Sequence, residues 1–246
     1  MATALKPRQE DPIADAPPPS PAPLPPLENG DRLTRAEFER RFDAMPHLKK
    51  AELLEGVVYM PSPVRLRHHG EPHANVLGWL TVYRAGTPGV IAADNTSARL
   101  DLDNEPQPDA LLMIEPDRGG QARISDDDYI EGAPELVVEV ASSSVSIDVH
   151  LKRHVYWRCG VREYLIWRVL DRQFDWLVLR DGQFVPLEPH AQGQYRSVSF
   201  PGLWLDPAAL LKGDISAVLE LVRQGLATAE HQQFIQLLAE RAGPAS

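Results

Sequence analysis

Two carboxylates are the side chains of this sequence best placed to do chemistry. Asp109 follows Pro108 at the start of one apolar run, and Glu139 lies within a later apolar run over 135–141. Burying a lone carboxylate costs several kcal/mol, so a buried Glu139 needs a cationic partner or a metal ion. Two carboxylates from adjacent strands, completed by backbone carbonyls and water, are typical of a site for Mg²⁺ or Mn²⁺. Turn chemistry at a strand start also explains Asp109, and the exposed face of an edge strand also explains Glu139. The pattern leaves both interpretations open.

A third candidate group lies in the helix expected over 145–158. Asp148, Lys152 and Tyr156 are four residues apart and therefore fall on one helix face. The apolar residues one position earlier repeat the same spacing and are predicted to form the buried stripe: Ile147, Leu151 and Val155. Lys152 would then lie at the border of that stripe, where its stem packs and its ammonium can reach a site. The alternative is an Asp148–Lys152 ion pair on the surface, worth a few tenths of a kcal/mol.

Glu52 and a group of histidines have weaker signals. Glu52 opens the segment 52–60, which reads as a strand, and taken alone it is a solvated junction residue. His69 and His73 are spaced i, i+4 at the start of an expected helix, with Arg65 and Arg67 just before them. A phosphate-facing cluster at a helix N-terminus is one interpretation, and a solvated polar turn is the other.

Several other chemistries are excluded. Cys159 is the only cysteine, so neither an intramolecular disulfide nor a cysteine-based zinc cage can form. The sequence has no GxxxxGK[ST], GxGxxG or GxSxG motif. The serine run 142–144 follows a strand and is better explained as a helix cap than as a nucleophile.

The elements that must position these residues follow from hydrophobic periodicity. Thr34-Arg35-Ala36-Glu37 has the form of a capping box and predicts a helix over 35–44. Further helices are expected over 68–85, 145–158, 214–225 and 227–241, and strands over 52–60, 89–93, 97–102, 110–115, 135–141, 161–169, 173–179 and 183–187. This order indicates a mixed-sheet α/β domain, bordering on α+β.

Composition indicates one folded domain with appendages. The chain has 246 residues and is 43% hydrophobic. Residues 1–30 are rich in proline and are expected to be disordered, the domain to span 31–212, and 213–246 to form a helical extension. No apolar run is long enough to cross a membrane, and the N-terminus has no apolar signal region, so a cytoplasmic protein is expected. The net charge of −10 argues against a protein that wraps nucleic acid by charge alone.

The motifs in their order resemble a known family. AELLEGVVYMPSP, a histidine-led helix, PQPDALL, GAPELVVEVASSS, D-x-x-x-K-x-x-x-Y and GVREYLIW follow one another over roughly 32–210. This series resembles a large bacterial family known as "putative restriction endonucleases" (Uma-type), which belongs to the PD-(D/E)XK nuclease superfamily. The resemblance implies a restriction-endonuclease-like mixed sheet of four to five strands, flanked by helices. It also implies cleavage of DNA phosphodiester bonds that depends on Mg²⁺ or Mn²⁺.

The resemblance also assigns roles to single residues. Asp109 matches the aspartate of the PD half-motif, and Glu139 matches the acid of the second half-motif; together they would hold the metal. The superfamily places a lysine two positions after that acid, where this chain has Ala141. The family supplies its lysine from the next helix, where Lys152 matches. Lys152 would be a catalytic residue that orients or helps to deprotonate the attacking water and stabilises charge on the phosphate oxygens. Glu52 matches the acid before the first strand and would be a catalytic residue that completes the metal shell.

Supporting positions and partners complete what the resemblance implies. Asp148 and Tyr156 match the helix positions around the lysine, and His69 is a looser match to the family's histidine. The expected partner is DNA, and cutting both strands is simplest for a homodimer. The alternative is a degenerate nuclease fold that serves as a nucleic-acid or protein interaction module. The acidic net charge favours this alternative. The presence of Asp109, Glu139 and Lys152 together argues against it.

Overall fold

The computed structural model describes residues 24–61 and 63–242. A six-stranded mixed sheet forms its centre, in the order β11-β10-β9-β8-β5-β3. The strands are β3 (Val90–Asp94), β5 (Ala110–Ile114), β8 (Leu136–Ala141), β9 (Glu163–Arg168), β10 (Gln173–Arg180) and β11 (Gln183–Pro186). Only β8 and β9 pair in parallel, and the other neighbours are antiparallel. The expected mixed sheet flanked by helices is confirmed, with one strand more than the resemblance implied.

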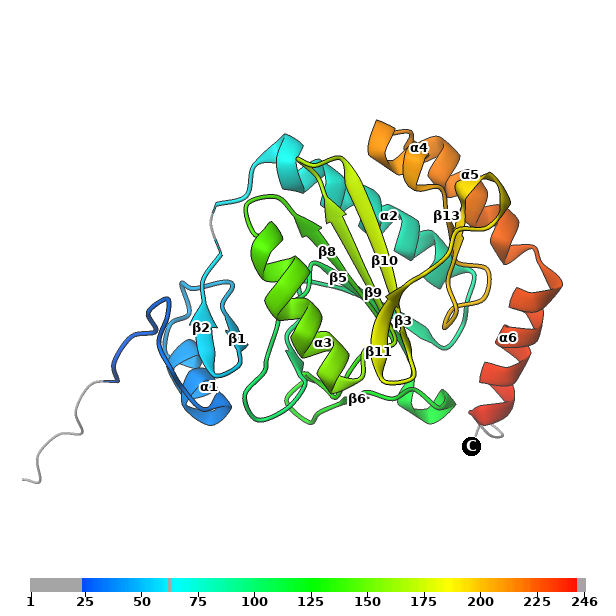
Figure 1. Ribbon diagram of the computed structural model, residues 1–246. Coiled ribbons are helices and arrows are strands. Elements are labelled where there is room, and N and C mark those ends of the chain that lie inside the picture. The colour runs from blue at the N-terminus through cyan, green and yellow to red at the C-terminus, as the bar shows by residue number, and fades with distance from the viewer. Residues whose placement is uncertain (1–23, 62, 243–246) are drawn as a thin grey trace, which may run out of the picture.

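Helices cover both faces of the sheet (Figure 1). On one face lie α2 (Glu71–Ala85) and, packed against it, α5 (Ile215–Leu226). On the other face lies α3 (Arg153–Cys159), which continues a π-helical segment over Ile147–Lys152. The sheet is therefore the middle layer of three.

The side-chain alternation of β8 explains where its acid points. Leu136, Val138 and Val140 pack in the cluster with α2, whereas Val137 packs in the cluster with Tyr156 of α3. Because successive side chains of a strand point to opposite faces, Glu139 shares the α3 face. All six residues of β8 are buried, as expected for a strand covered on both faces.

An N-terminal subdomain packs beside this sheet. It consists of α1 (Arg35–Asp43) and a hairpin of β1 (Glu52–Leu54) and β2 (Val57–Tyr59). The hydroxyl of Thr34 caps α1 as the capping box predicted. The single strand expected over 52–60 is corrected to this hairpin, because Glu55 and Gly56 both have positive φ, at 52° and 71°, and turn the chain.

Contacts with the folded part begin before residue 31, where the domain was expected to start. Residues 1–23 lie outside the described residues. Leu27 is buried against the subdomain and its N–H donates to the sulfur of Met45 over 3.2 Å. Among the described residues, Leu27 is therefore the first that is buried.

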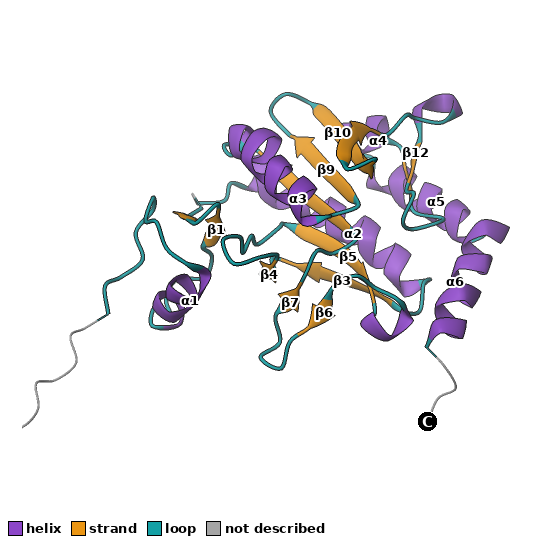
Figure 2. Cartoon of the chain, turned by 60° about the horizontal axis from the view of Figure 1, so that its bottom comes forward, coloured by secondary structure: helices purple, strands orange, loops and turns teal. Residues whose placement is uncertain are grey.

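A second small sheet lies below the main one in Figure 2 and has the order β4-β7-β6. Its strands are β4 (Ala98–Arg99), β6 (Arg123–Ile124) and β7 (Ile130–Glu131). The strand expected over 97–102 is thus reduced to β4, because a backbone turn joins Leu100 to Asn104.

The C-terminal part is helical, as expected. A short pair, β12 (Tyr195–Arg196) and β13 (Trp204–Leu205), leads into α4 (Pro207–Lys212), α5 and α6 (Ala229–Arg241). α5 and α6 contribute Val218, Val222 and Leu238 to the core on the α2 face. Gly202 and Gly225 bring their backbones together there, with no space for a Cβ on Gly225. Among the described residues, no helix is both long enough and apolar enough to span a bilayer.

Candidate active site

The register of β5 and β8 brings the two predicted carboxylates together. Ala110 pairs with Val138 in the antiparallel ladder, so the next residues outward, Asp109 and Glu139, lie side by side. Asp109 is fixed there because its Oδ2 accepts the backbone N–H of Val140 over 2.8 Å. Both residues are buried, at 5% and 2% exposure, so neither the turn nor the exposed-edge interpretation holds.

The helix that follows β8 adds a buried lysine. Lys152 Nζ lies 2.8 Å from Glu52 Oε1, 3.0 Å from Glu139 Oε1 and 3.8 Å from Asp148 Oδ1. The hydroxyl of Tyr156 donates to the same Glu139 oxygen over 2.8 Å. Since Lys152 is 4% exposed, the surface ion pair considered for the sequence is wrong. The first strand and this helix instead supply one network around Glu139.

This network reverses the predicted faces of the helix. The polar positions Asp148, Lys152 and Tyr156 are fully buried, whereas Ile147 and Leu151 are half-buried. Of the predicted apolar stripe only Val155 is fully buried. The physical reason is that the charged side chains satisfy one another across the helix–sheet interface, which offsets the cost of their burial.

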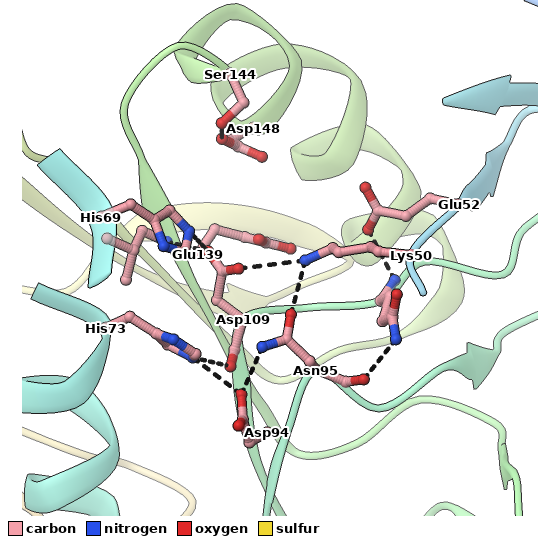
Figure 3. A network of polar contacts seen from close by, with 12 residues as sticks. Lys50, Glu52, His69, His73, Asp94, Asn95, Asp109, Glu139, Ser144 and Asp148 are labelled. Carbon is pink, nitrogen blue, oxygen red and sulfur yellow. Dashed lines mark hydrogen bonds and ion pairs between the residues drawn. The ribbon is translucent and has the colours of Figure 1, made fainter. Parts of the chain in front are cut away.

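Two histidines approach Asp109, His73 from the first turn of α2 and His69 from the helical turn Leu66–Gly70 just before it. His69 Nε2 lies 3.2 Å from Asp109 Oδ2, and His73 Nε2 lies 2.7 Å from the Asp109 carbonyl oxygen and 3.1 Å from Asp94 Oδ1. A carbonyl oxygen only accepts, so His73 carries a proton on Nε2. Both rings point to the acid in Figure 3, which excludes the solvated-turn interpretation.

Lys50 and Asn95 also belong to the site and were missed in the sequence. Lys50 Nζ donates to Asn95 Oδ1 over 2.9 Å and to Asp109 Oδ1 over 3.3 Å (Figure 3). The sequence could have indicated Lys50, because it lies two residues before Glu52. Residues two apart in an extended chain share a face, so the two side chains are expected on the same side. Asn95 could be recognised in the sequence only as a residue type common in turns. The structure places it in a turn, with φ of 47°.

Burial and the neighbouring charges shift the pKa values of the acids in the site. Burial raises the pKa of Glu139 to about 8, and the carboxylates of Asp109, Asp148 and Glu52 add to the rise while Lys152 opposes it. Burial also raises the pKa of Asp148. Burial acts the same way on Asp109, but the hydrogen bond from His69 and the charge of Lys50 outweigh it and hold the pKa of Asp109 well below its usual range.

The pKa of Lys152 is also raised, but for a different reason. Burial disfavours its charged form, but the attraction of Glu139, Glu52 and Asp148 exceeds that effect and raises its pKa well above the usual range. The arrangement therefore favours the charged form of Lys152.

The donor set fits a hard divalent cation. Four carboxyl groups face two lysines, and burial together with this excess of negative charge raises the pKa of Glu139. Mg²⁺ characteristically takes one or two carboxylates and keeps several waters, which matches the pair of Asp109 and Glu139. Over residues 24–61 and 63–242, no three His, Cys, Asp or Glu side chains converge as a preformed metal cage.

The network lines a pocket of about 1010 Å³. Its walls include the charged and polar groups Lys50, Glu52, His69, His73, Asn95, Asp109, Glu139, Asp148 and Lys152. They also include Tyr59, Met60, Pro63, Val64, Arg65, His68 and Leu170. This volume is at the upper end of the range for ligand pockets. The pocket lined by these acids is thus large enough to admit a bulky substrate.

Comparison with known proteins agrees with this architecture. A family model described as "Putative restriction endonuclease" (Uma2) matches residues 35–208, and the chain belongs to that family. A crystal structure of "a putative nuclease belonging to DUF820" from Anabaena variabilis has the same fold, with a TM-score of 0.54 and 15% identity. The match covers 71% of this chain and 97% of that one. No curated protein sequence matches.

Proposed function

We propose that this protein is a divalent-metal-dependent endonuclease that hydrolyses DNA phosphodiester bonds. Membership of a restriction-endonuclease family supports nuclease chemistry. The observation that carries the proposal is the burial of Glu52, Asp109, Glu139 and Lys152 around one pocket. Buried charges of this kind are expensive for a fold to retain, so their cost favours a catalytic centre over an interaction module.

Asp109 and Glu139 are the proposed ligands of Mg²⁺ or Mn²⁺. Such an ion, when bound, polarises a phosphoryl oxygen and lowers the pKa of water. The chain's own groups prepare the ligands. The Val140 N–H and His69 orient Asp109, while Lys152 and Tyr156 orient Glu139.

The remaining predicted residues have supporting roles in this proposal. Glu52 shares Lys152 with Glu139 and accepts the backbone N–H of Gln107 over 2.7 Å. It is therefore held at the edge of the site, where it can support the ligand shell. Asp148 accepts the hydroxyl of Ser144 over 2.6 Å, which fixes the start of the helix that carries Lys152.

The test is cleavage of supercoiled plasmid with Mg²⁺ or Mn²⁺, with and without a chelator. We expect nicked and linear products that disappear with chelator and in Asp109→Ala and Glu139→Ala. Glu220→Ala is the control, because that acid is exposed on α5 and remote from the pocket. Loss of one metal-ligand group is expected to slow cleavage by at least 10²-fold, the usual scale for a residue that stabilises charge in the transition state.

Two outcomes would contradict the proposal. Cleavage that survives in the Asp109→Ala/Glu139→Ala double variant would show that another site or a contaminant cuts DNA. A folded wild-type protein that binds DNA but cuts neither DNA nor RNA with either metal would favour the interaction module. A parallel RNA substrate also tests the preference for DNA.

We further propose that the active species is a cytoplasmic homodimer, because two copies can cut the two strands of a duplex. Sedimentation velocity of the full chain, with and without a DNA duplex, measures this directly. A monomer in both conditions would contradict it.

A further inference from the structure

The pocket holds two lysines whose surroundings differ sharply. The side chain of Lys152 is 5% exposed, whereas that of Lys50 is 23% exposed. Lys152 lies between Glu52 and Glu139 at ion-pair distance from both. Lys50 has a single carboxylate partner within the described part of the chain, Asp109, and the separation of 3.3 Å is long for a charge-assisted hydrogen bond.

The attachment of Lys152 limits what it can do. Its ammonium would have to leave two carboxylates and a buried position to reach a phosphate in the pocket. Leaving them would remove the cation that compensates Glu52 and Glu139 in a buried position, which is strongly unfavourable. Lys152 is therefore suited to hold Glu139 and Glu52 in place.

The attachment of Lys50 is weaker and depends on Asp109. The Oδ2 atom of Asp109 already accepts from Val140 and contacts His69, and Lys50 covers the other oxygen, Oδ1. A divalent cation held by Asp109 would repel an ammonium group at that carboxylate. Lys50 would then lose its one ion-pair partner while its stem remained in the pocket wall.

Asn95 gives Lys50 a second, neutral anchor at the pocket wall. Its Oδ1 accepts from Lys50, its amide nitrogen donates to Asp94 over 2.6 Å, and its carbonyl accepts from the side chain of Gln107 over 2.6 Å. A neutral acceptor does not cancel the charge of the ammonium. The ammonium therefore stays at the pocket wall as a cation available to an anionic ligand.

We propose that Lys50 is the lysine that contacts the substrate phosphate, and that Lys152 is a positioning residue that acts through Glu139 and Glu52. This inference rests on the proposed function, because it assigns the phosphate contact of that same site. The inference adds two residues to those proposed to act in the site. Lys50 contacts the phosphate, and Asn95 positions Lys50.

The test measures DNA binding against salt concentration. A short fluorescein-labelled DNA duplex is titrated with the full chain in Ca²⁺, which takes the same carboxylate oxygens as Mg²⁺, and the duplex is checked for integrity on a gel afterwards. Each phosphate contact by a lysine contributes about one unit to the slope of log affinity against log salt. Lys50→Ala is expected to reduce the slope by about one and to weaken binding by about tenfold at 0.1 M salt. Lys50→Arg keeps the charge and is expected to keep the slope.

Lys49→Ala is the matched control. Lys49 is the neighbouring residue with the same charge, but it is exposed and its ammonium donates to the Pro46 carbonyl oxygen outside the pocket. Its loss is expected to leave the salt slope unchanged. A cleavage assay in Mg²⁺ then shows whether Lys50→Ala changes KM, kcat or both.

The outcomes separate this inference from the proposed function. If the wild type binds and cuts DNA while Lys50→Ala keeps the full salt slope, Lys50 does not contact phosphate and the nuclease assignment still stands. If Lys50→Ala only weakens Ca²⁺ binding, measured by calorimetry without DNA, its role is to orient Asp109 and the inference is overturned. If the wild type neither binds nor cuts DNA, the proposed function fails and this inference fails with it.

Discussion

Replacement of Lys152 by alanine tests the electrostatic account of the site most directly. The substitution leaves Glu52, Glu139 and Asp148 without the cation that lies between them. Removing one partner of a buried ion pair costs about 3–5 kcal/mol of unfolding free energy. At about 2–4 °C per kcal/mol for a protein of this size, the melting temperature should fall by roughly 6–20 °C.

The pH dependence of this deficit gives a second, sharper measurement. Because the pKa of Glu139 is raised from 4.5 to about 8, the native state binds more protons than the unfolded state between these values. Its contribution to stability is therefore complete below pH 4.5 and is lost as the pH rises toward 8. Lys152 opposes that rise, so the pKa of Glu139 should rise further in Lys152→Ala, and the deficit should be larger at pH 8 than at pH 5.

The assay is urea unfolding of the wild type and the variant at pH 5, 6.5 and 8. Lys152→Met, which keeps most of the stem volume, should show a similar deficit if charge rather than packing is responsible. Lys49→Ala, on the surface, should change stability by less than about 0.5 kcal/mol. A deficit for Lys152→Ala below about 1 kcal/mol at all three pH values would refute the reasoning, since that is the size of a surface ion pair.

Three further predictions concern other parts of the molecule. Burial raises the pKa of Glu105 to about 8, so its contribution to stability is lost between pH 4.5 and 8; Glu105→Gln should be more stable than the wild type at pH 8.5 but not at pH 5, as measured by thermal melts. Gly225→Ala should cost about 1–3 kcal/mol in urea unfolding, because its Cβ would overlap the carbonyl oxygen of Gly202. Mg²⁺ at a hundredfold excess over its Kd should stabilise the wild type by about 2.7 kcal/mol, and an equal shift in Asp109→Ala/Glu139→Ala would place the ion elsewhere.

The sequence was sufficient to predict the sheet and the central acidic pair. The two buried runs that carry Asp109 and Glu139 have the length and composition of strands, and strands that follow one another along a chain usually pair. The cap of α1 at Thr34 was equally local, because all its partners lie within four residues.

The burial of the helix after β8 was not predictable by the same rules. Hydrophobic periodicity assigns the core face to Ile147 and Leu151, because it counts only apolar side chains as buried. It does not consider charged side chains that are buried together because they neutralise one another. The partner of Lys152 that reverses this assignment is Glu52, a hundred residues earlier in the chain. The π-helical turn over Ile147–Lys152 also departs from the 3.6-residue period on which the prediction depends.

The central position of β8 has a consequence for biosynthesis. β8 needs β5 on one side and β9 on the other, and the hydroxyl of Tyr164 in β9 donates to the carbonyl oxygen of Asp148 over 2.9 Å. The acids of the site have all been translated once Asp148 is added, yet the strand that closes β8 comes later. Pairings between distant segments form slowly, so a nascent chain that ends before β9 exposes the open edge of β8 and lacks a complete site. A ribosome-bound fragment that ends before β9 should therefore be sensitive to protease at β8, whereas a fragment long enough to bring residue 168 out of the exit tunnel should be protected there.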